Sequence, residues 1–261
     1  SWNSDAKVPN GKPKGGFKSQ NGFTINTGVV NQIDNEPVSP REVEEEIKVT
    51  DRDIGVLFPS LLFKSRVSDR DFLGSVKDRI LKATIAGDPK DPLGWYSFDN
   101  LHLHDDMQDV HDFLLKESAA VFAYYDFKVE EVYLTSMWAN VGYKPFYCHM
   151  NHTHPNSIFS GVFHVSVPNV GTTHAQTTTF SDPRPAARVI EPNVNSNFAA
   201  HNSGTVSPIV NNGSLFMFPS WLPHGVQQAW HDYQGIPRIS ISFNAMMTGE
   251  INTRTAPIKF S

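Results

Sequence analysis

The chain has 261 residues, of which 39% are hydrophobic and 19% charged, and these values are typical of a globular protein. Its 22 basic and 27 acidic residues give a formal net charge of −5, which argues against a protein that grips nucleic acid through the phosphate backbone. The single cysteine excludes a disulfide within the chain. No apolar run reaches the roughly 18 residues of a transmembrane helix. The first residues also lack the apolar core of a signal peptide, so we expect a cytoplasmic protein with no membrane contact.

Residues 1–50 differ in composition from the rest of the chain. They are rich in Gly, Asn, Pro and Lys and poor in large apolar residues, so we expect a partly ordered N-terminal arm. Within this arm, Ser39, Pro40 and Glu42 fit the start of a short helix. Residues 51–261 are expected to form one domain, with its globular part beginning near Ile54.

Two amphipathic helices are predicted before the β-rich part of the chain. The first follows the capping residues Ser68 and Asp69, and its apolar positions recur at helical spacing: Phe72, Leu73, Val76 and Ile80. The second lies within residues 107–127, and we place five residues on its apolar side: Val110, Phe113, Leu114, Ala120 and Val121. Helices followed by many strands suggest helices packed outside a β-core.

From Lys128 onward the sequence consists of short segments rich in β-branched and aromatic residues. The segments are separated by Gly, Pro and Asn clusters, and they cover residues 129–141, 159–168, 175–185, 213–226 and 236–247. This pattern predicts a mainly β fold, either a β-sandwich or a barrel-like jelly roll.

The last predicted strand has two chemically different faces. Successive side chains of a strand point to opposite sides, so Arg238, Ser240, Ser242 and Asn244 share one face, and Ile239, Ile241, Phe243 and Ala245 share the other. The segment 159–168 likewise places Val162, His164 and Ser166 together. A jelly roll whose inner face mixes polar and apolar groups usually encloses a site.

A pair of histidines, His152 and His154, is the first candidate for that site. If the chain there is extended, both imidazoles point the same way and can bind one ion. The pair alone is a weak signal, but His224 follows a later apolar strand, and Arg238 and Ser240 follow on the last one. A guanidinium beside a hydroxyl is well suited to a carboxylate. These residues together suggest a metal beside a carboxylate anchor, and hence an acidic co-substrate that also chelates the metal.

Four stretches in one order carry a likeness to a known family: HTHPNSIFSGVFHV, TTTFSDPR, NGSLFMFPSWLPHGV and RISISFN. They resemble the 2-oxoglutarate/Fe(II)-dependent oxygenases of the double-stranded β-helix fold, and the resemblance covers about Ile54 to Met247. It implies a cupin-like jelly roll with the N-terminal helices packed outside. It also implies Fe(II), 2-oxoglutarate and O₂ as cofactor and co-substrates, and hydroxylation of an unidentified substrate with release of succinate and CO₂.

The resemblance implies roles for particular residues. His152 would be the first iron ligand and His224 the distal histidine, and Arg238 with Ser240 would bind the far carboxylate of 2-oxoglutarate. His164 lies at nearly the offset where the aspartyl/asparaginyl β-hydroxylases place a histidine that contacts 2-oxoglutarate, so it is a further co-substrate candidate. Its alternative role is a hydrogen-bonded core histidine.

The chain departs from the family at His154, because the usual motif has Asp or Glu there and so gives two histidines and one carboxylate. Three alternatives follow. His154 is a third nitrogen ligand, or water takes the third position, as in the aspartyl/asparaginyl β-hydroxylases whose spacing HTHP matches, or Asp182 supplies the ligand. For Asp182 we favour a turn residue before Pro183.

Two other functions remain open from the residues alone. One is a cupin-like three-histidine metalloenzyme that does not use 2-oxoglutarate, although cupins usually carry a Glu where this chain has Ser157 or Ile158. The other is a non-catalytic jelly roll that binds a partner. In the first of these Arg238 has no special role.

Overall fold

The computed structural model describes residues 17–18, 24–25, 53–86, 94–144, 146–168, 177–190, 193, 199–227, 235–251 and 258–260. Backbone contacts divide the chain into two units, Ser1–Gly55 and Val56–Ser261. In the first unit, strands β1 (Phe17–Lys18) and β2 (Thr24–Ile25) form an antiparallel pair. The rest of the predicted arm, including the helix expected near Ser39, lies outside the described residues.

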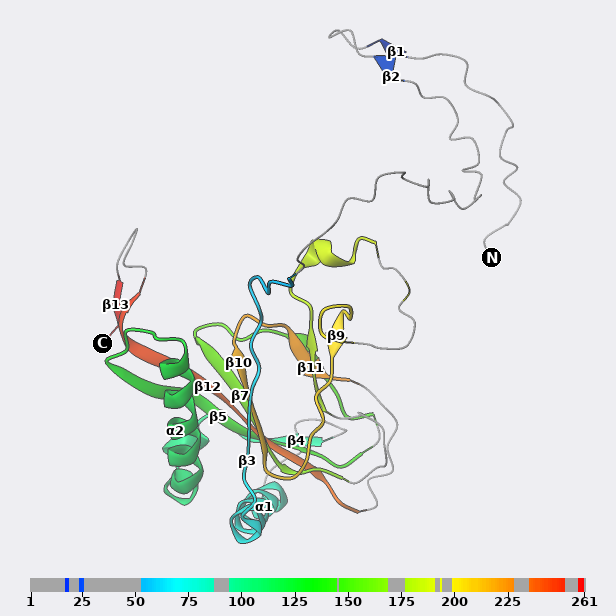
Figure 1. Ribbon diagram of the computed structural model, residues 1–261. Helices are drawn as coiled ribbons and strands as arrows, with labels where there is room; N and C mark the ends of the chain where they lie inside the picture. Colours follow the sequence, from blue (N-terminus) through cyan, green and yellow to red (C-terminus); the bar gives the residue numbers. More distant parts are fainter. Residues whose placement is uncertain are drawn as a thin grey trace, which may run out of the picture. The chain divides into compact units, whose positions relative to one another are not determined.

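Two antiparallel sheets form the second unit (Figure 1). The larger sheet has the strand order β3-β10-β7-β12-β5-β4, and β13 pairs with the end of β12. Its strands are β3 (Phe63–Arg66), β4 (Gly94–Tyr96), β5 (Glu131–Gly142), β7 (Phe159–Ser166), β10 (Ser214–Pro219), β12 (Arg238–Ile251) and β13 (Ile258–Phe260). The smaller sheet has the order β6-β11-β8-β9, with β6 (His149–His152), β8 (Thr178–Ser181), β9 (Thr205–Val206) and β11 (His224–Val226). The predicted jelly roll of the double-stranded β-helix type is confirmed.

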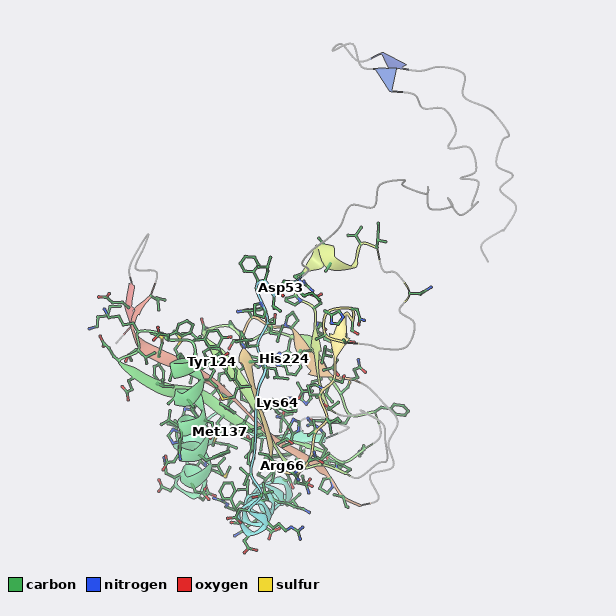
Figure 2. All side chains as sticks on the ribbon, in the orientation of Figure 1. Asp53, Lys64, Arg66, Tyr124, Met137 and His224 are labelled. Carbon is green, nitrogen blue, oxygen red and sulfur yellow. The ribbon has the colours of Figure 1, made fainter. Side chains whose placement is uncertain are left out.

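The alternation on the last strand decides which side of the larger sheet is core. Ile239, Ile241 and Phe243 are fully buried and belong to the main hydrophobic cluster. Met137 of β5, also fully buried, belongs to the same cluster, whereas His224 lies on β11 of the smaller sheet (Figure 2). The apolar face of the larger sheet therefore packs on the helices, and its polar face is left for a site.

Two long helices cover the apolar face. Helix α1 (Arg70–Ala86) begins where predicted, because the Asp69 carboxylate accepts hydrogen bonds from the backbone N–H groups of Asp71 and Phe72, both at 3.0 Å. Phe72 of α1 contacts Phe113 of α2 (Gln108–Tyr124), with ring centroids 6.3 Å apart, and Phe113 lies 5.3 Å from Phe163 of β7. The predicted placement of the helices outside the β-core is confirmed.

One position of the second helix was predicted wrongly. Ala120 is exposed, while Ser118 and Phe122 are buried in the helix face. Ala120 lies six residues after Leu114, a rotation of about 600°, which leaves it roughly 120° away from Leu114 around the axis. Ser118, four residues after Leu114, fits the buried face because its hydroxyl donates to the Leu114 carbonyl at 2.7 Å.

Shorter 3-10 helices complete the described elements at Leu101–Leu103, Asp105–Met107 and Pro185–Arg188. Within the part of the chain that the structure describes, no helix has the length and apolar character needed to span a bilayer.

Candidate active site

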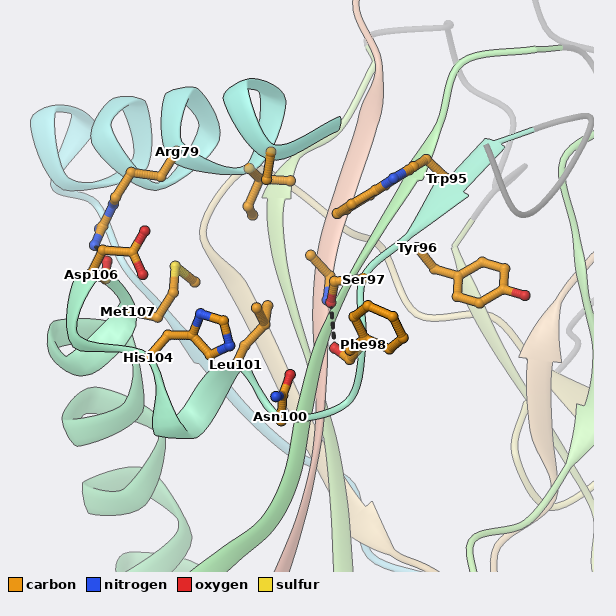
Figure 3. Close-up of a pocket in the computed structure, with 13 residues that line it drawn as sticks. Arg79, Trp95, Tyr96, Ser97, Phe98, Asn100, Leu101, His104, Asp106 and Met107 are labelled. Carbon is orange, nitrogen blue, oxygen red and sulfur yellow. Dashed lines mark hydrogen bonds between the residues drawn. The ribbon is translucent and has the colours of Figure 1, made fainter. Parts of the chain in front are cut away.

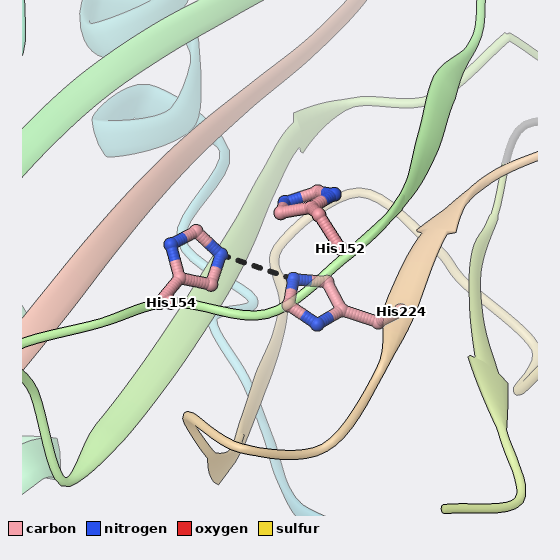
Figure 4. Close-up of side chains that lie close together, drawn as sticks. All are labelled: His152, His154 and His224. Atoms are coloured by element: carbon pink, nitrogen blue, oxygen red, sulfur yellow. Dashed lines mark hydrogen bonds between the residues drawn. The ribbon is translucent and has the colours of Figure 1, made fainter.

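Three histidines meet between the two sheets, at the start of β11 and the end of β6. The antiparallel register of these strands places His224 opposite His152, and His154 follows two residues later in the turn after β6 (Figure 4). One candidate ligand atom from each imidazole lies within 4.8 Å of the others. The His154 and His224 Nε2 atoms are 3.1 Å apart, and the His152 and His224 ring centroids are 4.6 Å apart. The arrangement is compact enough for all three rings to reach one ion.

Backbone carbonyls orient two of these rings. His152 Nδ1 lies 2.7 Å from the Met150 carbonyl oxygen, and His224 Nδ1 lies 2.9 Å from that of Leu222. A carbonyl only accepts, so each Nδ1 carries the proton and donates it. The Nε2 lone pairs of both rings are therefore available to a metal, which is how a second layer of hydrogen bonds fixes the tautomer of a histidine ligand.

Burial keeps two of the three imidazoles neutral. Removal from water, together with the neighbouring His224 and His152, lowers the pKa of His154 to about 4. The same removal lowers the pKa of His224 to about 4, against the opposing effect of its bond to Leu222. At neutral pH both rings then hold free lone pairs, as metal binding requires.

A cavity extends from the histidines along the polar face of the larger sheet. Arg238 is 2% exposed, and its Nη1 donates to the Ser240 hydroxyl at 2.9 Å. The described lining contains one guanidinium and no carboxylate; its residues are Trp138, Asn140, His149, His152, His154, Gly161, Val162, Thr178, Phe218, His224, Gly225, Val226, Arg238, Ser240 and Ser242. The cavity therefore has a metal-ligand set and a buried cation, a combination that favours a small anion able to chelate a metal.

The polar face of β12 does not belong entirely to this cavity. Asn244 accepts a hydrogen bond from the Ser160 hydroxyl at 2.7 Å and donates to that of Ser136 at 2.9 Å. It is absent from the described lining of the cavity, and so is His164.

His164 is fully buried, opposite Ser240 in the register of β7 and β12. Neither of its ring nitrogens has a hydrogen-bond partner among the described residues, so it is not the satisfied core histidine considered as its alternative. Burial, with the charge of Arg238, lowers its pKa well below the ordinary value and keeps the ring neutral.

Asp182 lies outside the histidine cluster. Its carboxylate accepts hydrogen bonds from the Arg184 backbone N–H at 3.0 Å and from the Arg184 guanidinium at 2.9 and 2.8 Å. This is the geometry of a turn residue, the interpretation favoured from the sequence.

His149 and Tyr147 are two residues of this region that were not predicted from the sequence to belong to the site. His149 lines the cavity, and its Nε2 lies 2.7 Å from the Tyr147 hydroxyl. The only available signal is the spacing His149-x-x-His152, and in a regular strand residues three apart face opposite sides.

A larger cavity, of about 400 Å³, lies on the other face of the sheet, against α1 (Figure 3). Ala139 of β5 lines it, whereas its neighbours Trp138 and Asn140 line the cavity with the histidines. Its walls are mainly apolar, and the Arg79 guanidinium at its rim is held by both carboxylate oxygens of Asp109 at 2.8 Å. Size alone therefore does not locate the chemistry, because the metal-ligand set belongs to the smaller cavity.

Residues 136–244 match a family model described as "Putative 2OG-Fe(II) oxygenase". The matched segment runs from β5 into β12 and contains the three clustered histidines together with Arg238 and Ser240. A comparison with the curated proteins found no match. The local likeness to aspartyl/asparaginyl β-hydroxylases is not part of this match and stays a prediction.

Among solved structures, the chain is similar to a prolyl-4-hydroxylase from Pseudomonas putida, with a TM-score of 0.49 and 12% identity over 73% of this chain and 94% of that one. A viral collagen prolyl hydroxylase from Paramecium Bursaria Chlorella virus-1 gives a TM-score of 0.47 and 10% identity over 75% and 100%. HygX from Streptomyces hygroscopicus, with nickel and 2-oxoglutarate bound, gives 0.47 and 12% over 72% and 83%. The similarity to the 2OG-Fe(II) oxygenase family therefore rests on the sequence match over residues 136–244.

Proposed function

We propose that this protein is an Fe(II)- and 2-oxoglutarate-dependent oxygenase that hydroxylates an as yet unidentified substrate. The observation that carries the proposal is the meeting of three histidine nitrogens with a buried arginine in one cavity, within the segment that matches the family.

Fe(II) would be held by His152, His154 and His224. The carbonyl bonds at Nδ1 leave Nε2 of His152 and His224 as the donors. His154 Nε2 lies 3.1 Å from His224 Nε2, and two neutral imidazoles bring their Nε2 atoms this close when an ion or a proton lies between them. Imidazole suits Fe(II), so this donor set fits the metal that the family requires. Among the three alternatives for the third ligand, this closeness supports His154 itself.

2-Oxoglutarate would bind with its far carboxylate on Arg238 and Ser240. Arg238 places a buried positive charge at the wall of the cavity, and a positive charge attracts an anion. A guanidinium can hold a carboxylate through two parallel hydrogen bonds, and the Ser240 hydroxyl adds a third polar group. His164, behind Ser240, keeps its predicted role as a co-substrate residue, and its two unpartnered nitrogens support a polar contact that is made only when the cavity is filled.

When bound, Fe(II) with 2-oxoglutarate and O₂ supplies the oxidation that places one oxygen atom on the substrate and the other in succinate, with loss of CO₂. The chain's own part is to hold the ligands, orient the diacid and exclude water. Val162 and Phe218 give the cavity apolar walls, and the Trp138 ring lies 5.8 Å from that of His154. Trp138 is thus placed to shape the side of the metal that a substrate approaches.

The proposal can be tested by binding, without knowledge of the substrate. Metal-free protein is kept anaerobic, and its melting temperature is measured with Mn(II), with 2-oxoglutarate and with both. A ligand that binds only the folded state raises the melting temperature, so we expect Mn(II) to stabilise the protein and 2-oxoglutarate to add a further rise in its presence. Stabilisation by Mn(II) but not by 2-oxoglutarate would point to the cupin-like enzyme, and stabilisation by neither would point to a non-catalytic binding protein.

Two variants separate the roles of the cavity ends. Arg238→Met should abolish the 2-oxoglutarate effect and leave Mn(II) binding, because it removes the cation and keeps a long side chain. Asp182→Asn is the matched control and should retain both, since Asp182 lies outside the cluster. Loss of Mn(II) binding in Asp182→Asn would make that carboxylate the third ligand.

The third ligand is tested at position 154. His154→Asp, which restores the usual acid of the family, should keep Mn(II) binding, whereas His154→Leu should weaken it by about tenfold or more, because a donor is lost. Equal Mn(II) affinity in His154→Leu and the unmodified protein would instead place water in the third position.

A further inference from the structure

Tyr147 is held in a fixed position beside the polar face of the larger sheet. The side chain is 1% exposed, and its ring packs on the backbone of Gly94 and Gly142, which are paired across β4 and β5. A Cβ at Gly94 would lie 2.5 Å from Tyr147 Cε2, and a Cβ at Gly142 would lie 2.6 Å from Cδ1. Only glycine leaves room for the ring at these two positions, so Gly94 and Gly142 form a recess in the sheet that holds Tyr147.

This recess lies beside Arg238. Gly142 is the register partner of Arg238 in the pairing of β5 with β12, and directly paired residues point to the same face of a sheet. A Cβ on Gly142 would run into the Tyr147 ring, so the ring occupies the face to which the Arg238 side chain points. Tyr147 therefore closes the Arg238 end of the region between the two sheets.

In this recess, the Tyr147 hydroxyl is within hydrogen-bond distance of His149. The hydroxyl lies 2.7 Å from His149 Nε2, and the two rings meet edge to face with centroids 5.0 Å apart. His149 lines the cavity together with Arg238 and Ser240, whereas Tyr147 is absent from its described lining. The hydrogen bond to His149 therefore gives Tyr147 a route by which to affect a molecule in the cavity.

An irregularity in β6 explains how His149 and His152 share one cavity. His152 pairs with His224 and His149 with Val226, so three steps along β6 match two along β11, and the register shifts between them. An extra residue of this kind is a β-bulge, which turns side chains that would face opposite sides toward the same side. The bulge thus places His152 beside the other two candidate metal ligands and His149 at the Arg238 end of the cavity.

We propose that His149 contacts the co-substrate at the Arg238 end of the cavity and that Tyr147 is the positioning residue that holds the His149 ring there. The inference rests on the proposed function, because it takes 2-oxoglutarate as the molecule that fills the cavity. The hydrogen bond fixes the rotation of the imidazole and assigns its Nε2 to Tyr147. The ring is then presented to the co-substrate in one orientation.

The test measures the dissociation constant of 2-oxoglutarate by calorimetry on the anaerobic, Mn(II)-loaded full chain. Tyr147→Phe removes only the hydroxyl, and because one neutral hydrogen bond is lost we expect binding to weaken about fivefold. His149→Ala removes the contact itself and should weaken binding about tenfold or more. His149→Gln, which can still bond to Tyr147, should recover part of the loss. The Mn(II) affinity should stay within about twofold in all three.

A double variant separates positioning from a general loss of structure. If Tyr147 acts through His149, Tyr147→Phe should add no further weakening to His149→Ala, because residues that act as one unit are not additive. Tyr143→Phe is the matched control, since its hydroxyl donates to the Gly94 carbonyl at 3.3 Å and is not bonded to a histidine. It should bind 2-oxoglutarate as the unmodified protein does.

Three results would overturn the inference. The first is unchanged 2-oxoglutarate affinity in both Tyr147→Phe and His149→Ala while the unmodified protein binds it, which leaves the proposed function intact. The second is full additivity of the two substitutions, which would mean that Tyr147 does not act through His149. The third is an unmodified, Mn(II)-loaded protein that does not bind 2-oxoglutarate, which removes the proposed function as well.

Discussion

Strand β12 presents two faces that differ in what they contact. Ile239, Ile241 and Phe243 point to the helices and are fully buried among apolar side chains. Arg238 and Ser240 point to the smaller sheet and are almost as buried, at 2% and 1% exposure, but they line a cavity with four histidines. Burial is therefore nearly equal on the two faces, and the chemistry of what is buried differs.

The difference separates stability from function within one strand. Burying an aromatic or branched apolar side chain contributes about 1.5–3 kcal/mol to folding. Burying a guanidinium or an imidazole costs free energy unless the group is paired, so the polar face contributes less to stability than the apolar face. The following predictions test whether the two faces can be disturbed separately, beginning with the largest effect.

Truncation on the apolar face should lower stability and spare the site. Phe243→Ala empties a fully buried position and should reduce the free energy of unfolding by about 3–5 kcal/mol. Ser242→Ala, its neighbour on the opposite face, loses the hydrogen bond from Asn140 at 3.1 Å and should cost about 1 kcal/mol. Urea denaturation measures both. Equal losses in the two variants would contradict the separation of the faces.

Truncation of a metal ligand should weaken metal binding and leave the stability of the metal-free protein nearly unchanged. His152 is exposed, so His152→Ala should change the free energy of unfolding of the metal-free protein by less than about 1 kcal/mol. Its Mn(II) affinity should fall by about 100-fold or more, because a ligand is removed. Calorimetry with Mn(II) is the measurement, and Thr153→Ala, the exposed neighbour, is the control. A variant that keeps its Mn(II) affinity would remove His152 from the ligand set.

Acid should lower the free energy of unfolding of the protein through two histidines on its polar side, His154 and His224. Burial lowers the pKa values of His154 and His224 to about 4 in the folded protein, from an ordinary value of about 6.5. The unfolded chain then binds more protons between these values, so stability is fully present above about pH 6.5 and is lost as the pH falls toward about 4.

The expected loss for the metal-free protein is on the order of 2 kcal/mol, after discounting for partial exposure. Urea denaturation between pH 7 and pH 4.5 measures it. His154→Leu should flatten part of this dependence, since one of the two titrating groups is gone. A pH dependence unchanged in this variant would mean that other groups cause it.

The smallest effect is expected at the surface pair beside the larger cavity. Hydrogen bonding to the Arg79 guanidinium lowers the pKa of Asp109, so the contribution of this pair is present above about pH 4 and is lost as the pH falls through the folded pKa. Both side chains are partly exposed, so Asp109→Asn should cost less than about 1 kcal/mol at neutral pH. Added salt should shrink the difference, and a loss above about 2 kcal/mol would show that the pair is more than a surface contact.

Much of the fold followed from local pattern. The alternation in the segment 236–247 assigned each residue of the last strand to a face, because a strand has a period of two. Asp69 predicted the start of the first helix, because a carboxylate just before a helix can accept hydrogen bonds from the backbone N–H groups of its first turn. Ala120 was placed wrongly because small residues carry a weak apolar signal, and the helical rotation was not followed through.

The site was predictable only in part. His152, His154 and His224 were named from spacing and resemblance, and the structure brings them together. His149 was not foreseen, because a bulge in one strand reverses the direction that regular alternation gives, and a bulge has no signature in a single sequence. Tyr147 was missed for a similar reason, since the two glycines that make room for it lie on other strands.

The sequence by itself determined which side chains share a face, because the period of a strand or helix is a property of the local backbone. Only the tertiary structure decided which faces meet. His154 and His224 are 70 residues apart in the chain, and they lie close together because β6 pairs with β11 and places His152 opposite His224. The same pairing decides that the polar face of β12 encloses a cavity, since a polar face without a facing sheet would be in contact with water.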